Sequence, residues 1–122
     1  MTSILCVDGY KNQCLLYEHE LSLEGYEVIM ASNGNNACKI VETRQPSVII
    51  MDISILSMIS IEAMYRIVSK HKDIPLIIYT DYDSYIDIFM SWAADAFIVK
   101  SSDLTELKNK IKELLEKGAV AV

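Results

Sequence analysis

The chain has 122 residues, 52% of them hydrophobic and 23% charged, a composition typical of one globular domain, which we assign to residues 1–122. A formal net charge of -6 argues against direct nucleic-acid binding, because surfaces of that kind are built from clustered Lys and Arg. No uninterrupted apolar stretch is long enough to span a membrane, and residues 1–3 lack the charged start of a leader. We therefore expect a cytoplasmic protein without a membrane partner.

Apolar runs alternate with helical patterns along the chain. We expect strands at residues 3–8, 27–31, 47–52, 75–80 and 96–99. The third and fourth of these are almost continuously apolar, as parallel strands covered on both faces should be. Five strands alternating with five helices predict an α/β fold with a doubly wound, flavodoxin-like parallel sheet of order 2-1-3-4-5. In that order the ligand crevice lies between the first and third strands.

The helical segments present an apolar face to the sheet. In the first segment, Cys14, Tyr17 and Leu21 share one face. The last segment has a stripe of four aliphatic residues, Leu104, Leu107, Ile111 and Leu114. We expect this last helix to be capped by Asp103 and to stop at Gly118.

Four of the five strands lead into a polar residue at the carboxyl end: Asp8, Asp52, Thr80 and Lys100. Because the carboxyl ends of parallel strands line up along one edge of a sheet, these four side chains are expected to converge in one crevice. Two carboxylates, a hydroxyl and an ammonium together suit metal-assisted phosphoryl chemistry. For Asp52 alone, the alternative is a helix N-cap at a strand end.

Short motifs along nearly the whole chain resemble those of one protein family. They are Val7-Asp8, Gly25-Tyr26-Glu27-Val28, Asn33-Gly34, Pro46 before residues 48–52, and residues 75–80 and 94–100. In this order and spacing, the motifs are similar to those of response-regulator receiver domains of two-component signalling. The resemblance implies a flavodoxin-like receiver domain for phosphorelay signal transduction, atypical at its metal site.

Carried over to this sequence, the resemblance implies that Asp52 accepts a phosphoryl group from a sensor histidine kinase or a phosphotransfer protein. Lys100 would pair with the acceptor and then with a phosphoryl oxygen, while Thr80 and Phe97 would form a conformational switch. The protein would then be a phosphoacceptor with autophosphatase activity and not an enzyme in the ordinary sense. Its fourth helix, fifth strand and fifth helix would form the face that binds a downstream protein target or a second copy.

The resemblance also implies a Mg²⁺ cofactor, held by Asp8, Asp52 and the backbone carbonyl of Ser54. The family usually has a second acid directly after the first strand, but this sequence has Gly9 there, so the metal site is weakened. Asp81 is a second departure from the pattern. It either replaces the acid that is missing at Gly9 or is a solvated loop acid.

Two further departures concern loops. Ser101 stands where the family has a proline that is commonly cis, and a trans bond after Lys100 would move this lysine or reshape the loop. The loop at residues 53–61 is aliphatic, and either forms an exposed partner surface or folds over the core. With Gly9 and Asp81, these departures support an alternative function, a degenerate receiver that acts as a phosphorylation-independent protein-interaction module.

Overall fold

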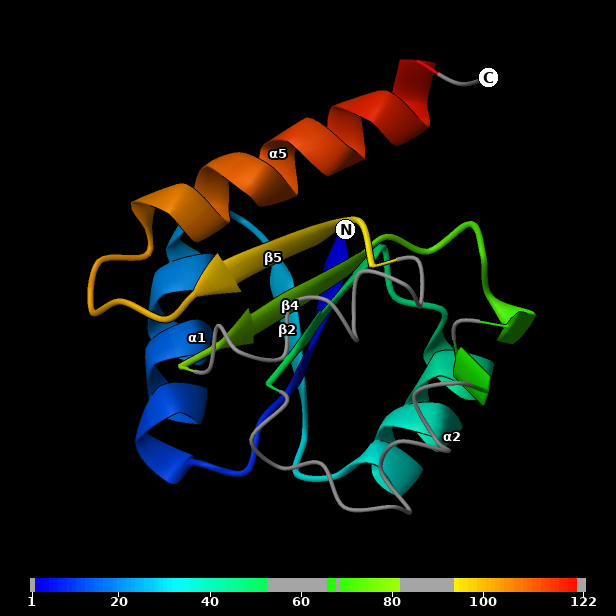
Figure 1. Cartoon of the computed structure of the whole chain (residues 1–122), viewed down its shortest axis with the longest axis horizontal. Coiled ribbons are helices and arrows are strands. Elements are labelled where there is room, and N and C mark those ends of the chain that lie inside the picture. Colours follow the sequence, from blue (N-terminus) through cyan, green and yellow to red (C-terminus); the bar gives the residue numbers. More distant parts are fainter. Residues whose placement is uncertain (1, 53–65, 68, 82–93, 121–122) are drawn as a thin grey trace.

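The computed structural model describes residues 2–52, 66, 67, 69–81 and 94–120 of the chain (Figure 1). These residues contain a five-stranded sheet of β1 (Ser3–Val7), β2 (Glu27–Ala31), β3 (Val48–Met51), β4 (Leu76–Thr80) and β5 (Ala96–Val99). All pairings are parallel, and the order β2-β1-β3-β4-β5 confirms the predicted flavodoxin-like sheet. Each strand lies within its predicted range and differs from it by at most one residue at either end.

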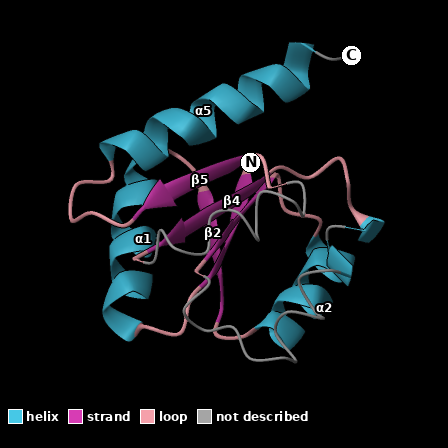
Figure 2. Ribbon diagram, in the orientation of Figure 1, coloured by secondary structure: helices cyan, strands magenta, loops and turns pink. Residues whose placement is uncertain are grey.

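The described helices are α1 (Lys11–Leu23), α2 (Gly34–Arg44) and α5 (Thr105–Val120). Helices α1 and α5 cover one face of the sheet, and α2 lies against the other (Figures 1 and 2). The third and fourth of the five predicted helices fall mainly on residues 53–65 and 82–93, outside the described residues, although residues 66, 67, 69 and 70 are helical. None of the helices in the described part of the chain has both the length and the apolar character needed to cross a membrane.

The sheet is buried on both faces because side chains alternate along each strand. In β1, Ile4 and Cys6 pack on the side of α1 and α5, whereas Leu5 and Val7 pack on the side of α2. The predicted apolar stripe is confirmed, since Leu107, Ile111 and Leu114 of α5 are buried against the first face, as is Leu104 directly before the helix. These two cores hold the strands in register, and thereby position the residues that follow the strands.

The ends of the helices differ in one respect from the prediction. The expected stop at Gly118 is wrong, because α5 continues to Val120. A glycine within a helix costs only about 0.5–1 kcal/mol relative to alanine, which does not by itself end the helix. Gly25, in contrast, follows α1 with a φ of 89°, in the left-handed region that favours glycine. At the start of α5, Asp103 Oδ1 accepts hydrogen bonds from the backbone N–H and the hydroxyl of Thr105 at 3.0 and 2.6 Å.

Candidate functional site

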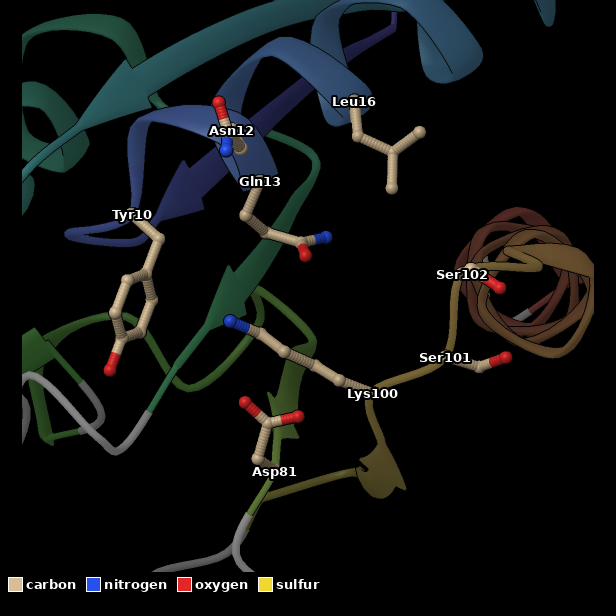
Figure 3. Close-up of a pocket in the computed structure, with 8 residues that line it drawn as sticks. All are labelled: Tyr10, Asn12, Gln13, Leu16, Asp81, Lys100, Ser101 and Ser102. Carbon is tan, nitrogen blue, oxygen red and sulfur yellow. The ribbon is translucent and has the colours of Figure 1, made fainter.

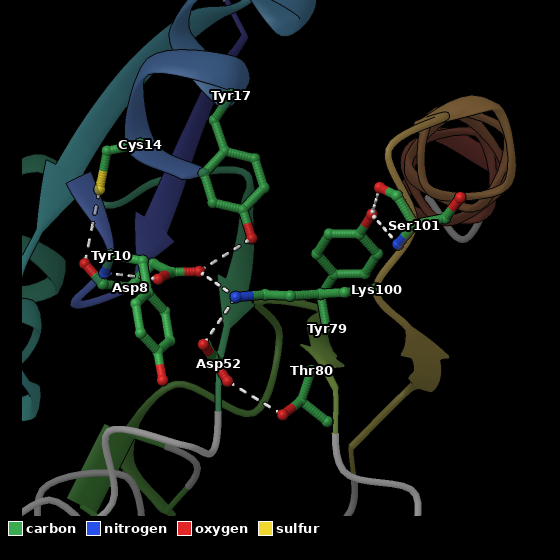
Figure 4. Close-up of polar contacts among 9 residues, drawn as sticks. All are labelled: Asp8, Tyr10, Cys14, Tyr17, Asp52, Tyr79, Thr80, Lys100 and Ser101. Carbon is green, nitrogen blue, oxygen red and sulfur yellow. Dashed lines mark hydrogen bonds and ion pairs between the residues drawn. The ribbon is translucent and has the colours of Figure 1, made fainter. Parts of the chain in front are cut away.

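Four polar residues meet at the carboxyl edge of the sheet (Figure 4). Asp8 and Asp52 directly follow β1 and β3, Thr80 ends β4, and Lys100 follows β5. The Asp52 N–H donates to the carbonyl of Val7 at 2.9 Å, and the Lys100 N–H donates to the carbonyl of Thr80 at 2.8 Å. These bonds continue the sheet ladder past the strand ends and fix the backbone there. The structure thus brings together the four side chains that the sequence places at one edge.

The ammonium of Lys100 lies between two carboxylates. Its Nζ is 2.7 Å from Asp52 Oδ2 and 2.9 Å from Asp8 Oδ2. The lysine side chain is 7% exposed and both carboxylate side chains are fully buried, so these ion pairs are shielded from water. Burial alone would lower the pKa of Lys100, but its hydrogen bonds and charge interactions with Asp52 and Asp8 outweigh burial and raise the pKa above its ordinary value.

The hydroxyl of Thr80 completes the surroundings of the Asp52 carboxylate. Thr80 Oγ1 donates a hydrogen bond to Asp52 Oδ1 at 2.9 Å. One oxygen of Asp52 therefore faces a hydroxyl, and the other faces the Lys100 ammonium. Since Asp52 and Thr80 are both fully buried, this arrangement is held by the fold and not by solvent. A helix N-cap, the alternative for Asp52, does not account for a carboxylate paired with an ammonium.

A second set of contacts holds Asp8, and sequence reasoning missed it. The hydroxyl of Tyr17 donates to Asp8 Oδ2 at 3.3 Å, and the backbone N–H of Tyr10 donates to Asp8 Oδ1 at 2.9 Å. Burial, followed by the charge of Asp8, raises the pKa of Tyr17 far above its usual value, so its hydroxyl remains a donor. The available signal was a tyrosine on the buried face of the first helix, because a buried tyrosine hydroxyl needs a partner.

The loop after Lys100 keeps the lysine in the site without a proline. No peptide bond among the described residues is cis, so the bond from Lys100 to Ser101 is trans. With this trans bond, the lysine reaches both carboxylates. The hydroxyl of Tyr79 contacts this loop, donating to the Ser101 carbonyl at 3.0 Å and accepting from the Ser101 N–H at 3.1 Å.

A cavity of about 440 Å³ opens beside the lysine (Figure 3). Tyr10, Gln13, Asp81 and Lys100 are among the residues that line it, and the Lys100 Nζ lies 5.0 Å from the centroid of the Tyr10 ring. Asp81 is exposed at the rim. Within the described ranges, no group of three His, Cys, Asp or Glu residues is placed to hold a metal ion. Asp81 therefore does not complete a ligand set with Asp8 and Asp52, and the solvated-acid interpretation fits the structure.

The remaining predicted site residues are placed less centrally. Phe97 is half-buried on β5, where it pairs with Ile78 of β4 and packs on the α2 side of the sheet. Gly9 is exposed directly after Asp8. Ser54 and the aliphatic loop at residues 53–61 lie outside the described residues.

The carboxylates of Asp8 and Asp52 can be compared with the ligands that Mg²⁺, the cation implied by the resemblance, requires. Proteins commonly hold Mg²⁺ through one or two carboxylates, with water completing the octahedron. Asp8 and Asp52 come from neighbouring strands and direct one oxygen each at a single cationic atom, the Lys100 Nζ. The two carboxylates therefore fit a small cation, provided that the ammonium shifts toward another partner.

The model of the response regulator receiver domain matches residues 4–112, which include β1 from its second residue, the other four strands and most of the chain. The chain therefore belongs to the response regulator receiver domain family. It is a receiver domain of two-component signal transduction, and its sheet has the flavodoxin-like order of that class.

The chain is also similar to individual known proteins. The alkaline phosphatase synthesis transcriptional regulatory protein PhoP of Bacillus subtilis (strain 168) is 28% identical over 120 residues, which are 97% of this chain and 50% of PhoP. The chain thus spans about half the length of this curated relative. A crystal structure of the response regulator TrrA from Thermotoga maritima in complex with Mg²⁺-BeF is 38% identical, with a TM-score of 0.85, and covers 93% of this chain and 99% of that chain. A crystal structure of the histidine kinase ThkA in complex with TrrA gives 39% identity and a TM-score of 0.83, over 94% of this chain and 99% of that chain.

Proposed function

We propose that this receiver domain, residues 1–122, accepts a phosphoryl group on Asp52 from a sensor histidine kinase or a phosphotransfer protein in the cytoplasm. One observation carries the proposal: the buried Asp52 carboxylate is held between the Thr80 hydroxyl and the Lys100 ammonium. Groups of these kinds stabilise a transferred phosphoryl group. The structure of TrrA with the kinase ThkA supports the class of partner.

In the proposed step, one carboxylate oxygen of Asp52 attacks the phosphorus atom of a phosphohistidine. The O–P bond forms while the P–N bond breaks, and the imidazole leaves with the electron pair and takes up a proton from solvent. Such a transfer needs positioning and charge neutralisation more than covalent help from the protein. The Lys100 ammonium and the Thr80 hydroxyl already contact the two Asp52 oxygens, so a short movement would bring both onto phosphoryl oxygens.

In this proposal Asp8 and Asp52 would hold Mg²⁺, together with the backbone carbonyl of Ser54. When bound, the ion would neutralise charge on the phosphoryl group. The complex of TrrA with Mg²⁺-BeF supports this assignment by similarity. Because Gly9 supplies no carboxylate, and because the Lys100 ammonium competes for the same two oxygens, we expect weak binding of the metal.

The output of the domain follows from the added charge. An aspartyl phosphate places about 1.5 to 2 negative charges at the end of β3, enough to bias a two-state element. Thr80 would move from Asp52 to the phosphoryl group, and Phe97 on the neighbouring strand would follow. The face formed by the fourth helix, β5 and α5 would then bind a target protein or a second copy, until slow hydrolysis by the domain itself ends the signal.

Incubation with acetyl phosphate and Mg²⁺, followed by intact mass measurement, tests the proposal. We expect a gain of one phosphoryl group in the wild-type protein and none in the Asp52→Asn variant. A Gly9→Asp variant should reach the same occupancy at lower Mg²⁺, because it adds a carboxylate beside the site. Gly9 does not have a positive φ, so the new side chain brings no backbone strain.

The opposite result would support the alternative function, a degenerate receiver. An absence of mass gain in the wild-type protein, even at high Mg²⁺, would contradict phosphoryl transfer. In that case we would favour a degenerate receiver that acts as a phosphorylation-independent interaction module. Two features support this function: the ammonium lies between the two carboxylates, and the acid is missing at Gly9. Recovery of the mass gain by Gly9→Asp alone would identify the lost ligand as the cause.

A further inference from the structure

The hydroxyl of Tyr79 binds both backbone groups of the residue that follows Lys100 (Figure 4). It accepts a hydrogen bond from the Ser101 N–H at 3.1 Å and donates one to the Ser101 carbonyl at 3.0 Å. The first of these bonds requires a residue other than proline at position 101, because proline has no backbone N–H. Two hydrogen bonds from one hydroxyl fix the orientation of the Ser101 backbone as well as its distance.

Two consecutive residues of β4 thereby form hydrogen bonds with the backbone of Lys100 and of the residue that follows it. On one side, the Lys100 N–H donates to the carbonyl of Thr80 at 2.8 Å. On the other side, the Tyr79 hydroxyl holds Ser101. Because side chains alternate along a strand, Tyr79 reaches this loop from the face of the sheet opposite to the Thr80 hydroxyl. Thr80 therefore contacts both the Asp52 carboxylate and the backbone of Lys100, and the residue before it, Tyr79, fixes the backbone of Ser101.

The ring of Tyr79 is itself held rigidly. The residue is 1% exposed and lies in the core between the sheet, α1 and α5. Its ring packs against that of Tyr17, with centroids 6.1 Å apart and an interplanar angle of 54°. The Tyr17 hydroxyl in turn donates to Asp8, the second carboxylate that pairs with Lys100. Contacts thus run from the Ser101 backbone through the rings of Tyr79 and Tyr17 to Asp8. Asp8 in turn pairs with the Lys100 ammonium.

We propose that Tyr79 is a positioning residue, whose hydroxyl fixes the loop that carries Lys100 and so aims the ammonium at Asp52. The effect on phosphoryl transfer rests on the proposed function, whereas the effect on the position of Lys100 does not. Loss of the hydroxyl frees the Ser101 backbone and lets the lysine move away from Asp52. A displacement of about 1 Å in a catalytic group costs up to about a hundredfold in rate, so we expect a loss of roughly tenfold.

The test compares Tyr79→Phe with Tyr26→Phe, which removes a hydroxyl from a partly buried tyrosine next to the amino end of β2. The first readout is the NMR shift of the Lys100 side-chain protons, which are sensitive to the Tyr10 ring 5.0 Å from the Nζ. The second is hydrogen exchange of the Ser101 amide. The third is the rate of phosphorylation of Asp52 by acetyl phosphate. We expect Tyr79→Phe to reduce the ring-induced shift, to accelerate the exchange and to slow the transfer, with Tyr26→Phe unchanged in all three.

The readouts separate the two proposals. If the wild-type protein gains no phosphoryl group, the proposed function fails, but the shift and the exchange still decide whether Tyr79 positions Lys100. A folded Tyr79→Phe variant with an unchanged Lys100 shift would overturn the positioning role. The wild-type protein gives a check that needs no variant. A slowly exchanging Tyr79 hydroxyl proton with a nuclear Overhauser effect to the Ser101 amide is expected, and a hydroxyl proton in rapid exchange with water contradicts the proposal.

Discussion

At the scale of single residues, the site depends on one buried cation. The Lys100 ammonium lies 2.7 Å from Asp52 and 2.9 Å from Asp8, and neither carboxylate is exposed to water. Two carboxylates so close to one another repel each other strongly in a region of low dielectric. The lysine offsets that repulsion in the unphosphorylated state, and the same charge would stabilise a phosphoryl group after transfer.

Replacement of the Lys100 side chain by an uncharged one should lower the stability of the fold. We expect Lys100→Met to lower the free energy of unfolding by about 3 kcal/mol at pH 7, because it leaves buried carboxylates without their partner. Lys117→Met is the matched control, since Lys117 pairs with Glu113 on the exposed side of α5 and its loss should cost under about 1 kcal/mol. Urea unfolding followed by circular dichroism measures both. Equal losses in the two variants would contradict the account.

The stabilisation by Lys100 should also depend on pH, with a defined sign. The pKa of Lys100 is raised above 10.5 in the folded protein. Its contribution is therefore fully present below about pH 10.5 and is lost as the pH rises through the higher folded value. The difference in unfolding free energy between wild type and Lys100→Met should stay constant from pH 7 to about pH 10 and narrow above pH 10.5. If the difference in unfolding free energy narrows below pH 9, a group other than Lys100 causes the pH dependence.

At the scale of elements, two glycines near helix ends behave differently. Gly25 follows α1 with a φ of 89°, whereas Gly118 is part of α5. Glycine after an amphipathic segment is the common signal for a helix end, and on this signal the sequence predicts a stop at Gly118. Only Gly25 acts in this way, since the backbone of α5 continues for two residues after Gly118.

Alanine substitutions at these glycines should have opposite effects. Gly25→Ala is expected to destabilise the fold by about 1–2 kcal/mol, because an alanine is strained at positive φ. Apart from Gly25 and its two neighbours in the chain, no atom of the described residues lies within 4 Å of the added Cβ, so the cost comes from the backbone. Gly118→Ala should stabilise the fold by about 0.5 kcal/mol, because alanine favours the helix. Thermal unfolding of the two variants measures both changes, and destabilisation by Gly118→Ala would contradict a helix that continues to Val120.

The elements themselves could be predicted because their signal is local. Continuous apolar runs such as Val48 to Met51 are typical of buried parallel strands, and the polar residue after each run marks the edge of the sheet. Since the strands are parallel and β1, β3, β4 and β5 are consecutive neighbours in the sheet, the four polar residues lie along one edge. The contacts of Tyr17 and Tyr79 could not be predicted in this way, because they depend on how α1 and the loop after Lys100 pack against the sheet. The trans bond before Ser101, in contrast, is the form expected before any residue other than proline.

At the scale of the whole molecule, the site lies where the order of the strands reverses. Strands β1 and β3 are neighbours in the sheet, with β2 on the outer side of β1, and Asp8 and Asp52 follow β1 and β3. Open parallel sheets bind ligands at this point, beyond the carboxyl ends of their strands. Both faces of the sheet are covered, so in the proposed function a phosphodonor would reach Asp52 from the carboxyl edge of the sheet.

The proposed function requires Asp52 to be the residue that carries the phosphoryl group. Reduction with borohydride converts an aspartyl phosphate to homoserine, so the modified position can be identified by mass spectrometry of proteolytic peptides. After incubation with acetyl phosphate and Mg²⁺, we predict homoserine at position 52 and at no other aspartate. Homoserine at another aspartate, or none in a folded protein that has gained a phosphoryl group, would contradict the account.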